Sequence, residues 1–494
     1  MLYINSRVQV IMAEESIKSA TIKGTFWKLS ERILTQIVSF VISIILARLL
    51  MPSDYGIIVL VSVFITICDK IVICGFATSL IQKKDADQLD FSTVFFFSLA
   101  MAVILYVLLF ISAPFIASFY SEFDRLTLIN VIRTLGISLF ILAVNSVQHA
   151  YVSKTMQFKR YFWSISGGTM LSGIVGVCMA YSGFGVWALV GQHLTMALTD
   201  TLILWFTVKW RPILSFSFQN LKVLFSFGSR VFLASLIKTI YNDLRSLVIG
   251  KFYSPAELAF YNRGQTFPQL LDSNVVGTLD SVLFPAFSKV QESKASVKLM
   301  LRRVIKVSSF VLMPLLAGLA SVAEPFVQIL LTDKWIECVP FVQILSFSFI
   351  LSAVEVENLQ AIKALGRSDI VLKQEVIKRI IGVIILLISI PLGVKAIAYG
   401  MLLSQVVAAI VNAFPSKKLL GYPLLEQLKD ILPYLLASLF MFVVLNIYST
   451  FISMGVWGSL FSQVIIGIIC YLSIMFFIKD DSFQYILHSL KREK

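Results

Sequence analysis

The sequence predicts an all-α polytopic membrane protein with about fourteen transmembrane helices, built as two pseudo-symmetric six-helix lobes plus two C-terminal helices. The first observation is composition: 58% of the 494 residues are hydrophobic and only 14% are charged. A soluble protein of this size is not so apolar. The second is that apolar windows of about 20 residues recur along nearly the whole chain. The third is that the segments between these windows are short, so no extramembrane domain is predicted.

The predicted helices follow one another through short loops. Their ranges, in chain order, are residues 25–50, 55–81, 91–119, 124–150, 161–182, 185–208, 222–250, 257–288, 300–323, 339–362, 370–391, 394–414, 428–449 and 454–478. The first six form an N-lobe (25–208), the next six a C-lobe (222–414), and the last two span residues 428–478. The remaining segments, predicted to be cytoplasmic, are residues 1–24, 209–221, 415–427 and 479–494.

Basic residues indicate the orientation of the chain. About thirty of the 42 Lys and Arg residues fall in loops on one side of the spans or near the termini, against about six on the other side. Loops rich in Lys and Arg stay in the cytoplasm, so both termini are predicted to be cytoplasmic. The same bias explains the net charge of +14, and nucleic acid is not an expected partner. Translation from Met12 instead of Met1 stays an open alternative.

A weak internal repeat supports two related lobes. Residues 47–54 and 250–257 both read small, basic, two apolar, any, Pro, small, acidic, and both lie between two predicted spans. The same offset pairs Asp69 with Asp272. Two six-helix blocks that each enter from the cytoplasm would be related by an axis along the membrane normal. Transporters of this kind place their binding site between the two halves.

One predicted span carries cations through most of its length. Arg230, Lys238, Tyr241 and Arg245 fall within an arc of roughly 80° on one helix face. Each cation facing lipid would cost roughly 2.5–3.5 kcal/mol, or about 8–10 kcal/mol for the three. This face is therefore predicted to line a watery interior that binds an anion. The alternative is that these cations pair with acids on other helices and only fix packing.

The repeat predicts a polar face on the first span as well. Arg32, Gln36, Ser39 and Ser43 step by four, three and four residues and so form one helical stripe. Other charged residues also fall inside predicted spans. They either pair across helices and fix the packing or take part in transport. They are Asp69, Arg133, Asp200, Asp243, Asp272, Asp280, Glu355 and Glu357.

Several kinds of chemistry have no matching motif. The three histidines, His149, His193 and His488, are too scattered to predict a metal centre. A P-loop for ATP is absent. The sequence also has no long external loop with the acids or histidines that a membrane-bound glycosyltransferase would need. The prediction is therefore a protein that is not an enzyme and holds no metal.

Short motifs along the chain resemble one family. Residues 47–56 read ARLLMPSDYG, and the other motifs are QFKR at 157–160, GVWALV at 185–190, AFYNR at 259–263, LFPAFSK at 283–289, KW at 334–335 and LGRSD at 365–369. In this order, over nearly the whole chain, they resemble Wzx-type polysaccharide or O-antigen flippases. These belong to the multidrug/oligosaccharidyl-lipid/polysaccharide (MOP) exporter superfamily, and colanic-acid and teichuronic-acid exporters are the most similar branch. The resemblance implies a MOP/MATE-like fold.

The resemblance also implies a function and a substrate. Such proteins carry undecaprenyl-pyrophosphate-linked oligosaccharide repeat units across the bacterial inner membrane by alternating access, for surface polysaccharide synthesis. Expected partners are this lipid-linked sugar, membrane lipid and other polysaccharide-assembly proteins. Pyrophosphate or acidic sugars would be attracted by Arg32, Arg230, Lys238 and Arg245. Sugar hydroxyls would bond to Gln36, Tyr241 and Asn242.

Ion coupling and two other functional classes stay open. If transport is coupled to H⁺ or Na⁺, the candidate sites are Asp69 and Asp272; no other cofactor is expected. A drug or metabolite antiporter of the same superfamily is the main alternative. Its cavity would be expected to hold acids, because many such drugs are cations. A polysaccharide polymerase would favour a large periplasmic loop, which the sequence lacks.

Overall fold

Every regular element that the computed structural model describes is helical. The described backbone covers residues 2–452 and 454–478, and the described side chains leave out residues 2–23, 25, 227, 279–282 and 284. The predictions for the start at Met1 or Met12, the tail 479–494 and the Asp280 side chain lie outside this part.

The chain forms two compact units, residues 1–256 and 257–494. Unit 1 holds α1 (Leu2–Leu49), α2 (Pro52–Ile73), α3 (Phe76–Gln82), α4 (Gln88–Phe119), α5 (Arg125–Gly136), α6 (Ser138–Lys154), α7 (Phe158–Tyr181), α8 (Val186–Thr207) and α9 (Phe218–Phe252). Unit 2 holds α10 (Pro255–Lys289, from its third residue), α11 (Lys294–Ser321), α12 (Ala323–Leu331), η1 (Asp333–Cys338), α13 (Val339–Phe349), α14 (Ser352–Ala364), α15 (Ser368–Ser389), η2 (Ile390–Leu392), α16 (Val394–Leu420), α17 (Leu424–Phe451) and α18 (Val456–Ile478).

Each of the fourteen predicted ranges overlaps a helix or a pair of successive helices. Within the described residues, ten helices are long and apolar enough to cross a membrane, or up to 11 if the bent α9 counts as one span. The helices α8, α10 and α15 do not reach this apolarity, because polar or charged residues interrupt their windows. The prediction of a polytopic helical membrane protein is confirmed, whereas the number fourteen and the position of the termini stay predictions.

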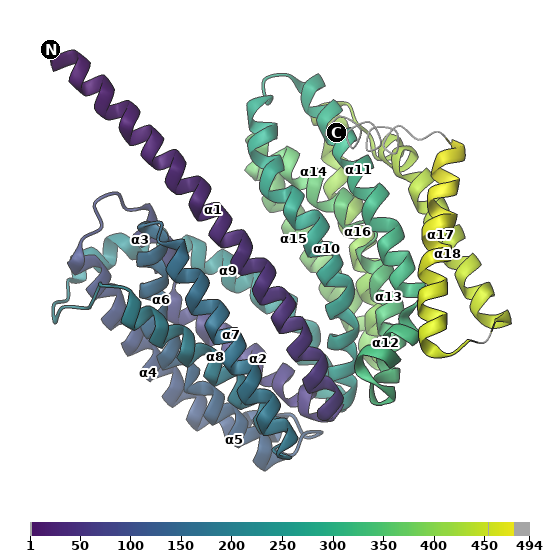
Figure 1. Cartoon of the computed structure of the whole chain (residues 1–494), viewed down its shortest axis with the longest axis horizontal. Coiled ribbons are helices and arrows are strands. Elements are labelled where there is room, and N and C mark those ends of the chain that lie inside the picture. Colours follow the sequence, from purple (N-terminus) through teal and green to yellow (C-terminus); the bar gives the residue numbers. More distant parts are fainter. Residues whose placement is uncertain (1, 453, 479–494) are drawn as a thin grey trace. The chain divides into compact units, whose positions relative to one another are not determined.

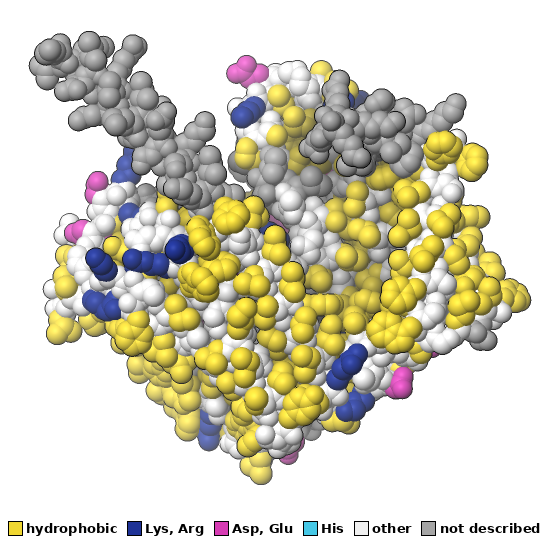
Figure 2. Space-filling view, viewed as in Figure 1, with side chains coloured by type: hydrophobic (Ala, Val, Ile, Leu, Met, Phe, Trp, Pro, Cys, Tyr) yellow, Lys and Arg dark blue, Asp and Glu magenta, His cyan; other side chains and the backbone are white. Residues whose placement is uncertain are grey.

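The outer surface suits a lipid environment. Large apolar side chains such as Phe115 (72% exposed) and Ile388 (64% exposed) point outward. In the face drawn in Figure 2, hydrophobic side chains cover most of the described surface, and Lys and Arg side chains gather near its edges. Apolar side chains cover the outside because lipid, unlike water, does not penalise them.

In unit 1, α1 packs along α7, and α7 in turn packs along α8 (Figure 1). Gly173 of α7 lets α1 approach closely, since an added Cβ there would lie 2.0 Å from the Ile42 Cδ1 atom. A separate apolar core around Phe91, Phe95 and Trp210 joins α3, α4, α6 and α9. Helix α1 therefore packs on α7 through its apolar side, which includes Ile42.

Two helix breaks meet inside unit 1. The chain turns between α2 and α3 through left-handed residues, Cys74 (φ 46°) and Gly75 (φ 72°). Helix α9 bends by 53° between Phe218–Ser226 and Gly228–Phe252. A Cβ on Gly75 would lie 2.3 Å from the Gly228 carbonyl oxygen, so only glycine permits this approach.

Helix α9 packs against α2, α3 and α4 and belongs to unit 1, although its range falls in the predicted C-lobe of residues 222–414. Its first turns are held there by Asn220, which donates to Asp90 at 2.9 Å, and by the Leu224 carbonyl, which accepts from Ser79 at 3.0 Å. The compact units divide at 256/257. Which helices move together as a lobe stays a prediction.

Unit 2 is built around α11, α16 and α17, with a buried polar network in its core. The Asn358 amide of α14 donates to Gln427 of α17 at 2.8 Å and accepts from the Ser416 hydroxyl of α16 at 2.6 Å. Asn358, Ser416 and Gln427 are fully buried. Because each polar group needs a partner in this setting, the network fixes how these three helices align.

Candidate functional site

The predicted cationic face of α9 points away from the body of unit 1. Arg230 and Lys238 are exposed, and Tyr241 and Arg245 are half-buried. Gly228 and Ser246, which lie about 120° around the helix from the centre of this arc, are buried. Asn242 is exposed next to Tyr241, so its amide is accessible as the prediction requires.

Two cations of α9 take part in none of the ion pairs of the described residues. These are Arg230 and Lys238, whereas Arg32 of α1 has Glu31 beside it and interacts with its charge. By contrast, Lys83 pairs with Asp90 at 2.6 Å near the end of α3. A cation with no acid beside it offers its charge to an incoming anion.

The polar stripe of α1 also lies at the surface of unit 1. Arg32 and Ser39 are exposed, and Gln36 and Ser43 are half-buried. The stripe runs beside the edge that packs on α7, where Ile42 is buried. It therefore borders the packed edge of α1.

The structure does not bring all of these residues together. The packing contacts of α1 are chiefly with α7, and those of α9 are with α2, α3 and α4. Packing of α1 on α9 is not among the main helix contacts of the described residues. Both stripes belong to unit 1, and a ligand that touched both would have to bridge them.

The two candidate coupling acids lie in different units and have different surroundings. Asp69, in α2, is half-buried and next in sequence to Lys70. Asp272, in α10, accepts a hydrogen bond from the Ser352 hydroxyl of α14, with Glu355 of the same helix nearby. The Glu355 carboxylate is itself 3.0 Å from the ammonium of Lys378.

Sequence reasoning missed a buried polar cluster in unit 1. Asp200 of α8 lies 2.8 Å from the His149 ring and accepts from the Asn145 amide at 2.5 Å, both on α6. Asp200 was only one of several charges in predicted spans, and His149 was one of three scattered histidines. The four-residue spacing of Asn145 and His149 places them on one helix face, which was the available signal; the approach of Asp200 depends on tertiary packing.

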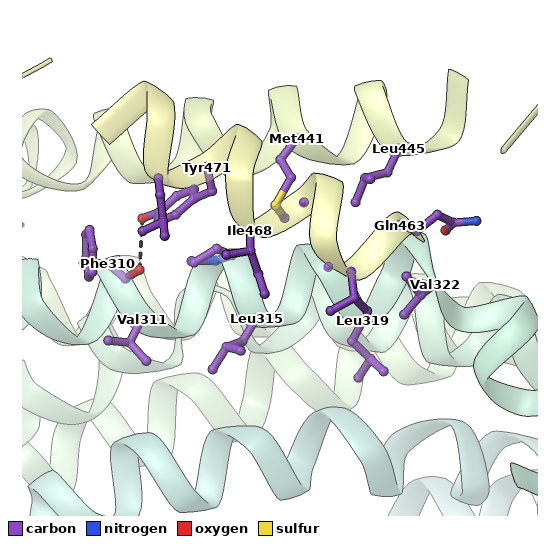
Figure 3. A pocket seen from close by; sticks show the side chains of 15 residues that line it. Phe310, Val311, Leu315, Leu319, Val322, Met441, Leu445, Gln463, Ile468 and Tyr471 are labelled. Carbon is purple, nitrogen blue, oxygen red and sulfur yellow. Dashed lines mark hydrogen bonds between the residues drawn. The ribbon is translucent and has the colours of Figure 1, made fainter. Parts of the chain in front are cut away.

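Unit 2 contains an apolar cavity of about 400 Å³ between α11, α17 and α18 (Figure 3). Leu315, Leu319, Met441 and Ile468 are among the side chains that line it. Near one end the Tyr471 hydroxyl donates to the Phe310 carbonyl at 2.9 Å, so that polar group is satisfied. The cavity has the chemistry for a hydrocarbon chain and lacks charged groups for a head group.

Together, the spans and the exposed cationic face define a polytopic membrane transporter. The fold is similar to the solved structure of the lipid II flippase MurJ in its inward closed conformation, with a TM-score of 0.74 and 14% identity over 93% of this chain and 99% of that chain. It is also similar to an inward-facing MATE-family multidrug resistance transporter of the MOP superfamily, with a TM-score of 0.59 and 18% identity over 77% of this chain and 92% of that one. The expected MOP/MATE-like fold is thereby confirmed.

The chain belongs to the polysaccharide biosynthesis protein family, whose model matches residues 45–340. It is 27% identical to the teichuronic acid biosynthesis protein TuaB of Bacillus subtilis (strain 168) over 302 residues, which span 60% of this chain and 61% of TuaB. Its identity to the lipopolysaccharide biosynthesis protein WzxC of Escherichia coli (strain K12) is 24% over 405 residues, or 81% of each chain. The succinoglycan biosynthesis transport protein ExoT of Rhizobium meliloti (strain 1021) is 23% identical over 323 residues, or 65% of each chain. The resemblance to polysaccharide exporters is confirmed.

Proposed function

We propose that the protein is a flippase for undecaprenyl-pyrophosphate-linked oligosaccharide repeat units. It moves them across the bacterial inner membrane by alternating access, for the synthesis of surface polysaccharide. The observation that carries this proposal is the exposed cationic face of α9 in a transporter fold. Three cations on one face match the charge of a pyrophosphate, and the family supplies the sugar-lipid class of substrate. The protein is a transporter and not an enzyme, in keeping with relatives named as a transport protein and a flippase.

Each part of the substrate has a chemically matched group. The pyrophosphate binds to Arg230, Lys238 and Arg245, with Arg32 of α1 as a further cation. Sugar hydroxyls bond to Gln36, Tyr241 and Asn242. The isoprenoid tail stays in contact with lipid between helices.

Orientation, coupling and assembly complete the proposal. Both termini lie in the cytoplasm, following the distribution of Lys and Arg. Coupling to H⁺ or Na⁺ uses Asp69 or Asp272, the acids that the internal repeat pairs. Other polysaccharide-assembly proteins on the periplasmic side receive the repeat unit.

The role of the cationic face can be tested by measuring surface-polysaccharide export in cells that carry substituted variants of the protein. The double substitution Lys238→Ala with Arg245→Ala should abolish surface polysaccharide while the protein still inserts at its normal level. A matched control is Lys222→Ala, which removes an exposed cation of the same helix outside the 230–245 arc. Normal export by the double variant at normal protein level would rule out the cationic site.

An ion-coupled drug or metabolite antiporter is the second candidate, and the MATE fold favours it. The two functions differ in the charge that the site must accept. Cationic drugs would be repelled by Arg230 and Lys238, whereas a pyrophosphate is attracted. Efflux of cationic dyes that fails in the absence of the protein would support the antiporter.

A further inference from the structure

The segment between α8 and α9 displays large apolar side chains at the surface of unit 1. Leu214 is 95% exposed, and Phe218, the first residue of α9, is 79% exposed. Phe216 lies between them in the chain and is also exposed, and its ring centroid is 4.8 Å from that of Phe218. The sequence LSFSF at 214–218 alternates apolar residues with serine, a spacing that places the apolar side chains on one side of an extended chain. We call Leu214, Phe216 and Phe218 the linker patch.

The backbone under the linker patch is fixed on α4. The Ile213 N–H donates to the Ser92 hydroxyl at 3.0 Å, and the Ser217 N–H donates to the Thr93 hydroxyl at 3.2 Å. Ser92 and Thr93 are fully buried, and Trp210, at the start of the segment, belongs to the apolar core of unit 1. Because these contacts hold the chain in place, the patch is a built surface of the fold. Contiguous exposed apolar side chains of this kind mark an interaction site.

The length of α4 gives the depth of the linker patch in a membrane. Helix α4 has 32 residues and is long and apolar enough to cross a bilayer. It is about 48 Å long, so when it is centred in a hydrocarbon layer of about 30 Å, about 9 Å at each end lies outside that layer. Ser92 and Thr93 follow the start of α4 at Gln88 by about 6–8 Å along the axis. The segment that binds them therefore lies at the depth of the lipid headgroups.

The charges of the segment fit the same depth. Arg211 turns inward, because its guanidinium donates to the carbonyls of Val208 and Trp210 at 2.6 and 2.7 Å. Lys209 is exposed and takes part in none of the ion pairs of the described residues. The neighbouring loop between α3 and α4 exposes both signs of charge, with Lys84, Asp85 and Asp87. A cation beside exposed aromatic and aliphatic side chains is the combination that binds a lipid surface, through phosphate and hydrocarbon together.

We propose that the linker patch is a membrane-interface anchor, which inserts among the lipids beside unit 1 while Lys209 binds the phosphate of an acidic lipid. The occupant is the bilayer surface itself. This contact does not depend on the proposed function, and only the side of the membrane follows from the proposed orientation. The anchor fixes the start of α9, the helix with the cationic face, at the membrane surface.

Fluorescence quenching measures whether the patch lies in lipid. The full-length protein, with its five cysteines replaced by serine, carries Leu214→Cys labelled with bimane and is placed in phosphatidylcholine nanodiscs. Position 214 is exposed, so the substitution leaves the fold intact. We expect lipids brominated near the headgroup to quench this label at least twofold, and more strongly than lipids brominated near the chain end. Ile104→Cys, at an exposed position in the middle of α4, should show the reverse order, and Asp85→Cys, in the neighbouring loop, should be quenched by aqueous iodide instead.

Each outcome supports or overturns the anchor. A label at position 214 that iodide quenches as strongly as one at position 85, with no effect of brominated lipid, overturns it. Shielding of position 214 from iodide in native membranes but not in nanodiscs also overturns it and assigns the patch to a protein partner. Addition of phosphatidylglycerol should increase lipid quenching at position 214, and Lys209→Gln should abolish that increase. Equal quenching with and without phosphatidylglycerol overturns the phosphate contact. These readouts do not involve sugar transport, so they are independent of whether the protein is a flippase.

Discussion

The side-chain amide of Asn220 donates to Oδ1 of Asp90 at 2.9 Å, which joins the start of α9 to the start of α4. The other oxygen of Asp90 is 2.6 Å from the Lys83 ammonium, and the carboxylate is fully buried. This junction holds α9 in unit 1 and so determines where the cations of α9 are displayed.

Asp90→Ala should destabilise unit 1. The substitution leaves Lys83 and Asn220 without their acceptor. Because Lys83 is partly exposed, we expect a loss of about 1–3 kcal/mol, the range for a lost buried hydrogen-bond partner. The measurement is the midpoint of thermal unfolding of the purified protein in detergent. Asp85→Ala, which removes an exposed acid of the neighbouring loop, is the control and should change stability by less than about 0.5 kcal/mol. Equal midpoints for the two variants would show that the junction is dispensable.

Gly75→Ala should disturb the contact between the two helix breaks. The added Cβ meets the Gly228 carbonyl oxygen at 2.3 Å, in addition to the strain of a left-handed residue, which costs about 1–2 kcal/mol. Gly183→Ala is a matched control, because its φ is also positive, 81°, but nothing lies within 4 Å of its Cβ. Export and thermal stability should fall further for Gly75→Ala. If the two variants behave alike, the close approach of α9 has no role.

For export, the positive charge at position 238 should matter more than the shape of the side chain there. Lys238→Arg keeps the cation and is expected to retain export. Lys238→Gln removes a charged hydrogen bond worth about 1.5–3 kcal/mol, which corresponds to a loss of about tenfold or more in affinity. The initial rate of lipid-linked sugar transport by reconstituted protein is the readout. A Gln variant as active as the Arg variant would exclude an electrostatic role.

One ion pair at the start of α15 should make the stability of the fold depend on pH in the acidic range. Arg367 donates to both carboxylate oxygens of Asp369 at 2.9 and 2.8 Å and lowers the pKa of that group to about 2. A lowered pKa in the folded state stabilises the fold above the unfolded value of about 4, and this contribution is lost as the pH falls to about 2. Arg367→Ala should bring the pKa of Asp369, followed by carboxyl NMR, back toward its ordinary range. An unchanged titration would assign the shift to the helix start instead.

The positions of the helices could be predicted because apolar windows depend only on local composition. The exposed side of α9 could also be anticipated, since helical periodicity alone groups Arg230, Lys238 and Arg245 on one face. Contacts between side chains of different helices could not be predicted. The approach of Asp200 to His149 and of Asn220 to Asp90 depends on which helices are neighbours, and hydropathy carries no such information. For the same reason, the sequence did not reveal that α9 packs with unit 1.

The central claim is that the protein moves lipid-linked sugar across the inner membrane. The most direct measurement is the fate of undecaprenyl-linked oligosaccharide in cells depleted of the protein, with its exposure tested from the periplasmic face by a membrane-impermeant enzyme. We expect the lipid-linked sugar to accumulate out of reach of that enzyme while surface polysaccharide is lost, and its mass would identify the repeat unit. Unchanged export in a depleted strain that lacks redundant flippases would contradict the claim.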